Sequence, residues 1–149
     1  MKKLIGIVFL FTIVSVSAQT TSAIYQTKKG AINGFDAVAY FTQHKAVAGS
    51  KQFAVKYRDA IWYFSSNENK EAFKKNPAAY EPQYGGYCAY GCSRGYKAKT
   101  EGGAWSIVNG KLYLNYNLDV RTDWNKDQDG YIKKADANWV KVKDSAFEE

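Results

Sequence analysis

The chain has 149 residues, a formal net charge of +7 and an aromatic content of 16%. Two cysteines are too few for a disulfide framework, and the lysines are scattered among acidic residues instead of forming a long basic run. This distribution argues against nucleic acid as a partner, and the length is that of one ordinary domain.

The first 18 residues have the pattern of a secretory signal peptide. Lys2 and Lys3 precede an uncharged apolar run over residues 4–16, and the small residues VSA at 16–18 suit a signal peptidase. The apolar run is shorter than the span of about 20 residues that crosses a bilayer. We therefore expect a protein that is exported to the periplasm or secreted, is not embedded in a membrane, and begins at Gln19.

Residues 19–30 are polar and predict a flexible lead-in. Residues 53–64 predict a β-hairpin with its turn at Arg58-Asp59. Apolar and polar residues alternate before this turn, and aromatic residues dominate after it, which is the usual pattern of paired strands.

Two helices are expected between the hairpins. Ser66 is suited to cap a helix over residues 67–75, in which acidic residues come early and lysines come late, with Phe73 facing inward. Residues 86–94 predict a second, short helix that ends at Gly95, because glycine readily adopts the left-handed conformation that terminates helices.

The last third of the chain begins with the clearest local signal. Residues 105–114 predict a hairpin around Asn109-Gly110, the favoured dipeptide for a two-residue turn. Two short helices separated near Gly130 follow, and residues 143–149 predict a frayed tail. The order of elements indicates a small single α+β domain over residues 31–142, in which antiparallel hairpins pack with short helices.

Four blocks of sequence occur in an order typical of one family: GFDAVAYF, IWYFSSNENKEAFKKNPAAYEPQYGGYCAYG, VNGKLYLNYN and IKKADANW. Together they resemble the YHS-domain family in the form found in exported bacterial proteins. The resemblance extends over roughly residues 31–140 and implies a YHS-like α+β fold. It also implies binding of a transition metal, because related modules hold such metals through cysteines.

The chain departs from the metal-type members of that family at the ligand positions. Where the resemblance places three sulfur ligands, this sequence has Ala39, Ser65 and Asn69. The positions that match are those of the scaffold: Asp36, Phe64, Phe73, Pro77 and Tyr80. Any metal chemistry based on sulfur must therefore use other residues.

Cys88 and Cys92, in YGGYCAYGCSRGY, are the only sulfur ligands of the chain after residue 18. On a helix, residues four apart share a face, so two thiolates could hold copper as Cu(I) or supply half of a zinc site. His44 is the one candidate for a third ligand, although its context TQHKA also fits a solvated turn. A structural disulfide and simple burial as small apolar residues are the other interpretations of the cysteine pair.

Residues 125–136, NKDQDGYIKKAD, partly match a calcium-binding loop. Asn125, Asp127, Asp129 and Asp136 occupy ligand positions, with Gly130 at the turn. Asparagine at the first position and aspartate in place of the closing glutamate both weaken the match. We therefore favour a solvated turn over a calcium site.

A group of aromatic residues could either line a ligand pocket or fill a core. It consists of Tyr84, Tyr87, Tyr90, Tyr96, Trp105 and Tyr113. One histidine provides no catalytic triad, and no Gly-Lys phosphate loop is present, so nothing in the chain supports an enzyme. Two hypotheses follow: a module that binds a transition metal, copper before zinc, through Cys88 and Cys92; or a module that binds a small ligand or a protein and has structural cysteines.

Overall fold

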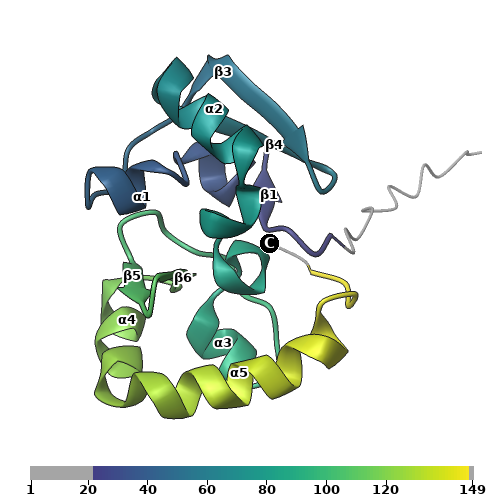
Figure 1. Cartoon of the computed structure of the whole chain (residues 1–149). Helices are drawn as coiled ribbons and strands as arrows, with labels where there is room; N and C mark the ends of the chain where they lie inside the picture. The colour runs from purple at the N-terminus through teal and green to yellow at the C-terminus, as the bar shows by residue number, and fades with distance from the viewer. Residues whose placement is uncertain (1–21, 148–149) are drawn as a thin grey trace, which may run out of the picture.

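In the computed structural model, which describes residues 22–147, antiparallel hairpins alternate with short helices (Figure 1). The predicted signal peptide at residues 1–18 lies outside the described residues. The hairpins pair β1 (Gln26–Thr27) with β2 (Gly30–Ala31), β3 (Ser50–Tyr57) with β4 (Ala60–Phe64), and β5 (Trp105–Val108) with β6 (Lys111–Leu114). This arrangement confirms the α+β class.

The helical segments are short, with one exception. The α-helices are α1 (Ala39–Thr42), α2 (Asn67–Lys75), α3 (Ala89–Ser93), α4 (Leu118–Trp124) and α5 (Gln128–Val142). The 3-10 turns are η1 (Ile32–Gly34), η2 (Pro77–Ala79), η3 (Gln83–Gly86) and η4 (Asn125–Asp127). Across residues 22–147, no helix combines the length and the apolar character needed to cross a bilayer.

The expected β3–β4 hairpin and α2 are both confirmed, and local chemistry explains them. Arg58 and Asp59 have φ values of 49° and 60°, the left-handed geometry of the two-residue turns that match strand twist. Helix α2 begins after Ser66, whose hydroxyl accepts a hydrogen bond from the Asn69 N–H at 3.1 Å. Phe73 is fully buried, as expected.

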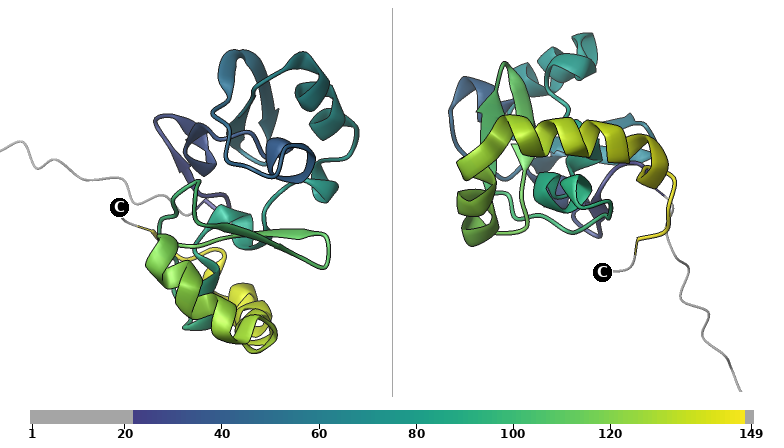
Figure 2. Two further views of the ribbon diagram at one scale, coloured as in Figure 1. Left: turned by 90° about the vertical axis from the view of Figure 1, so that its left-hand side faces the viewer. Right: turned by 90° about the horizontal axis from the view of Figure 1, so that it is seen from below.

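The β5–β6 hairpin is confirmed as well, with Asn109 and Gly110 at φ values of 51° and 73°. Two hydrophobic clusters lie on the two sides of this hairpin. One is built by the β3–β4 hairpin, α1 and α2, and the other by η3, α3, α4 and α5 (Figure 2). The helix pair α3 and α5 is packed closely in the second cluster.

Residues 22–30 and 143–147, the described parts of the expected lead-in and tail, contact the rest of the domain, whereas residues 19–21 and 148–149 lie outside the described residues. Ile24 and Tyr25 are buried. The Lys97 ammonium donates to the carbonyl oxygens of Ser22, Lys143 and Ser145 at 3.1, 2.6 and 2.8 Å. A single buried cation therefore links residues near both ends of the described chain, and its three carbonyl partners offset part of its desolvation.

The last two helices divide at a different place from the one expected. The break falls at η4, and Gly130 lies in the first turn of α5. Asp127 explains the shift, because its carboxylate accepts a hydrogen bond from the Gly130 N–H at 3.1 Å and so caps α5. The capping aspartate, and not the glycine, marks the boundary.

Candidate functional site

Cys88 and Cys92 are buried free thiols beside α3, exposed by only 2% and 0%. Helix α3 begins at Ala89, so Cys88 is its N-cap residue instead of sharing a helical face with Cys92 as expected. The Cys88 sulfur accepts a hydrogen bond from the Gly91 N–H at 3.4 Å and donates to the Asn115 side-chain oxygen at 3.6 Å. The Cys88 thiol thus acts as a capping group.

Burial raises the pKa of both thiols. For Cys92, burial and the nearby Cys88 raise the pKa to about 12. Because the thiolate is the form that attacks electrophiles and binds metals, both sulfurs are in their unreactive state at neutral pH.

We predict that the native thiols resist alkylation by iodoacetamide at pH 8. Cys92 should react roughly 1000-fold more slowly than in urea-unfolded protein, because its thiolate fraction is that much smaller. Labelling of the native protein should speed up as the pH rises towards the Cys92 pKa of about 12. Mass spectrometry of digested samples measures both sites, and native labelling as fast as in urea would contradict the prediction.

His44 does not join the cysteines. It is exposed in the loop after α1 with a φ of 53°, whereas α1 and α3 lie in different halves of the molecule (Figure 1). Within residues 22–147, no group of three or more His, Cys, Asp and Glu side chains is placed to hold a metal ion. The geometry matches the solvated-turn interpretation of His44.

The partial calcium-loop match falls on helical structure, which corrects the expectation of a turn. Asn125 and Asp127 belong to η4, and Asp129 and Asp136 belong to α5. Asp127 caps α5, and Asp136 accepts a hydrogen bond from the Tyr84 hydroxyl at 2.9 Å. The oxygens therefore serve the helix and its packing, because a helix cannot wrap them around one ion.

The four aromatic residues proposed for a pocket do not share one. Tyr84 and Tyr87 are buried in the second cluster, where both pack on Trp139 of α5. Tyr90 packs on the half-buried Tyr131 of α5, and Trp105 packs on Tyr40 in the other half. Tyr84 alone borders an opening, a second cleft of ≈ 500 Å³ against α5. This placement favours the core interpretation.

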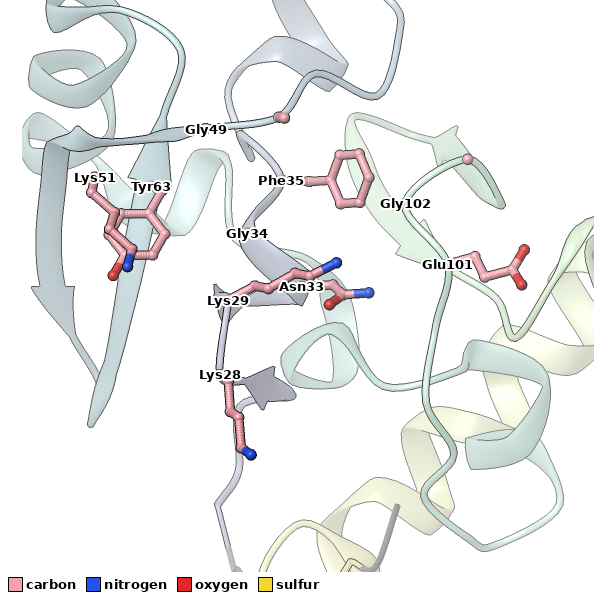
Figure 3. A pocket seen from close by; sticks show the side chains of 12 residues that line it. Lys28, Lys29, Asn33, Gly34, Phe35, Gly49, Lys51, Tyr63, Glu101 and Gly102 are labelled. Carbon is pink, nitrogen blue, oxygen red and sulfur yellow. The ribbon is translucent and has the colours of Figure 1, made fainter.

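A different cleft, of ≈ 620 Å³, lies between the β1–β2 and η1 region, the β3–β4 hairpin and the loop over residues 101–103 (Figure 3). We call it the lysine-lined cleft, since three lysines border it together with two aromatic rings and one carboxylate. These side chains are Lys28, Lys29, Lys51, Phe35, Tyr63 and Glu101. Asn33 and five small residues complete the lining: Gly34, Ala48, Gly49, Gly102 and Gly103.

Close packing of backbone against aromatic rings sets the shape of this cleft. A Cβ atom on Gly102 would lie 2.4 Å from the Phe35 ring, and one on Gly49 would lie 2.4 Å from the Tyr63 backbone. The buried Tyr40 hydroxyl donates to the Gly102 carbonyl at 2.9 Å. Burial and the neighbouring Asp36 raise the pKa of that phenol, so it remains a donor.

Asp36 anchors the strand-to-helix connections behind Phe35. Its carboxylate is fully buried and accepts from the N–H groups of Val38 and Ala39 at 2.9 and 3.1 Å. The Ser65 N–H, the Ser65 hydroxyl and the Asn69 amide donate to its other oxygen at 2.8, 2.6 and 2.7 Å. The three positions at which the family resemblance places sulfur thus lie together, around a carboxylate satisfied by hydrogen bonds.

Sequence reasoning did not find the lysine-lined cleft. Its residues come from three segments that span positions 28 to 103, and none forms a local motif. The pairs Lys28-Lys29 and Gly102-Gly103 were the available signals. Comparison with protein-family models, curated proteins and solved structures gave no match. The resemblance to YHS domains therefore stays a prediction.

Proposed function

We propose that this chain is an exported, YHS-type binding module that holds a small organic ligand in the lysine-lined cleft, with structural cysteines. The observation that carries the proposal is the cleft itself. Its ≈ 620 Å³ falls within the range of about 300–1,000 Å³ typical of small-molecule sites. Its walls combine half-buried rings with a few polar groups, which is the usual composition of such sites.

The buried thiols support the same reading of the molecule. Cys88 caps α3 and Cys92 belongs to the second hydrophobic cluster, so both sulfurs already have structural roles. Metal binding would require expulsion of two protons from groups whose pKa values burial has raised.

A fragment screen followed by NMR tests the proposal. With the purified, ¹⁵N-labelled protein, we expect some fragments to shift the amide signals of Gly34, Gly49 and Gly103 together. Gly103→Leu should abolish these shifts, because a Cβ there meets no atom within 4 Å and the added side chain can occupy the opening without strain. Lys111→Leu, an equally apolar change at an exposed position of β6, is the control.

The outcome that would refute the proposal is a screen in which no fragment shifts the cleft signals. Shifts that survive Gly103→Leu would also refute it, because the ligand would then bind elsewhere.

The second candidate is a Cu(I) site formed by Cys88 and Cys92. One observation favours it: the two sulfurs lie near enough for Cys88 to raise the pKa of Cys92. Titration of the reduced protein with Cu(I) against a competing chelator would support this candidate if the protein bound one equivalent and the Cys88→Ser/Cys92→Ser variant bound none. Equal binding by both proteins would exclude these thiols as ligands.

A further inference from the structure

The charge of the lysine-lined cleft points to the class of its ligand. Lys28, Lys29 and Lys51 are exposed at its border, and Glu101 is the only acidic group that lines it. Within the part of the chain that the structure describes, the ion pairs formed by other lysines and Arg58 involve none of these four residues. The border therefore carries three positive charges against one negative charge, and none of the ion pairs among the described residues neutralises them.

Asn33, the neutral polar side chain of the cleft, also favours a ligand that accepts hydrogen bonds. The Asn33 side-chain oxygen accepts a hydrogen bond from the Thr27 hydroxyl at 3.1 Å. Among residues 22–147 no group accepts a hydrogen bond from the Asn33 side-chain amide nitrogen, and Figure 3 shows the amide near the Lys29 ammonium. A ligand group that accepts several hydrogen bonds and carries negative charge complements this arrangement.

The rings supply the apolar part of the site. Phe35 and Tyr63 are half-buried and come from different segments, and Figure 3 shows the Phe35 ring between Gly49 and Gly102. The residue after Phe35, Asp36, is buried and fixed by hydrogen bonds, and Gly102 packs against the Phe35 ring. The position of the ring is therefore set before any ligand binds. A rigid ring loses little freedom on binding and offers a contact surface for an apolar or aromatic group.

We propose that the lysine-lined cleft selects small organic anions, with an anionic carboxylate or phosphate group near Lys29 and Asn33 and an apolar body against Phe35. Figure 3 shows Lys51 and Tyr63 together on the far side of the cleft, where Lys51 adds to its positive charge. This inference rests on the proposed function and adds the chemical class of the ligand. The positive charge of the cleft favours anionic over neutral ligands. The Phe35 ring favours an anion with an aromatic body over an inorganic anion, which has no apolar surface to pack on it.

Matched probes test the inference by NMR titration at low salt. Benzoate and phenyl phosphate are the anionic probes, benzamide is the neutral analogue of benzoate, and inorganic phosphate lacks the apolar body. We expect benzoate to bind several-fold more tightly than benzamide, since the anion meets the Lys29 ammonium and the Asn33 amide in a cleft of net positive charge. Phenyl phosphate should likewise bind more tightly than inorganic phosphate, and 200 mM salt should weaken both anions.

Charge-removing variants locate the effect. Lys29→Gln should weaken benzoate binding by about three- to fivefold, as expected for an exposed charge, and leave benzamide unchanged. Lys56→Gln, an exposed lysine of β3 that does not line the cleft, is the matched control and should have no effect.

Three outcomes would overturn the inference while the proposed function stands. The first is benzamide binding as tightly as benzoate with cleft signals shifting. The second is Lys29→Gln without effect, and the third is Lys56→Gln as damaging as Lys29→Gln. If neither these probes nor any other fragment shifts the cleft signals, the proposed function itself fails, and the inference fails with it.

Discussion

Replacement of Phe73 by alanine is expected to lower the free energy of unfolding by about 3–5 kcal/mol. Phe73 is the centre of the first hydrophobic cluster. Its ring lies 5.0 Å from the Phe64 ring, 5.1 Å from the Trp62 ring and 5.5 Å from the Tyr57 ring, centroid to centroid. These neighbours belong to the β3–β4 hairpin, so Phe73 is the main contact that fastens α2 to the strands.

The size of the effect follows from burial. Phe73 has no exposed surface, and its removal leaves a cavity that rigid aromatic neighbours cannot close. Urea unfolding followed by tryptophan fluorescence measures the change, with Trp62 as a reporter next to the substitution. Lys75→Ala, on an exposed position of the same helix, should change stability by less than about 0.5 kcal/mol. A loss below about 1 kcal/mol for Phe73→Ala would contradict this picture of the core.

The second large effect is expected at Asp36. Asp36→Ala should cost about 3–5 kcal/mol, because it leaves three backbone N–H groups, the Ser65 hydroxyl and the Asn69 amide without their acceptor. Such unsatisfied donors each cost roughly 1–3 kcal/mol when buried, and the partly buried ones recover some of this from water.

Asp36→Asn distinguishes the loss of hydrogen bonds from the loss of side-chain volume, because Asp36→Ala removes both. The amide keeps the shape of the carboxylate but offers one acceptor oxygen and turns an NH₂ group towards existing donors, so we expect an intermediate loss. Asp119→Ala, at an exposed position in the first turn of α4, is the control and should cost less than about 1 kcal/mol. Equal stability of Asp36→Ala and the unmodified protein would refute the anchoring role.

The Asp36 substitutions also bear on the cleft. Asp36 directly follows Phe35, which lines the cleft, and its carboxylate connects this segment to Ser65 after β4 and to Asn69 in α2. We therefore expect Asp36→Asn to weaken benzoate binding along with stability. The loss of benzoate affinity should be larger than for a substitution elsewhere in the core that lowers the free energy of unfolding equally, because Asp36→Asn loosens the segment that carries Phe35.

Secondary-structure elements that depend on a few adjacent residues could be predicted from the sequence. The Ser66 cap and the two-residue turns at Arg58-Asp59 and Asn109-Gly110 each depend on a few adjacent residues, and all three occur where the sequence indicates. Boundaries with two competing signals were not predictable in the same way. Asp127 prevailed over Gly130 as a helix signal, and Cys88 became a cap instead of a helical residue.

Local residue patterns were enough to predict the α+β class, the two longer hairpins and α2, because backbone turn geometry and helix capping depend on a few adjacent residues. The other features arose from the packing of whole elements. This packing buried the two cysteines and gathered Ala39, Ser65 and Asn69 around Asp36. It also brought lysines from positions 28, 29 and 51 to the border of one cleft with the loop over residues 101–103. Burial and long-range juxtaposition depend on how whole elements pack, and no local pattern in the chain encodes them.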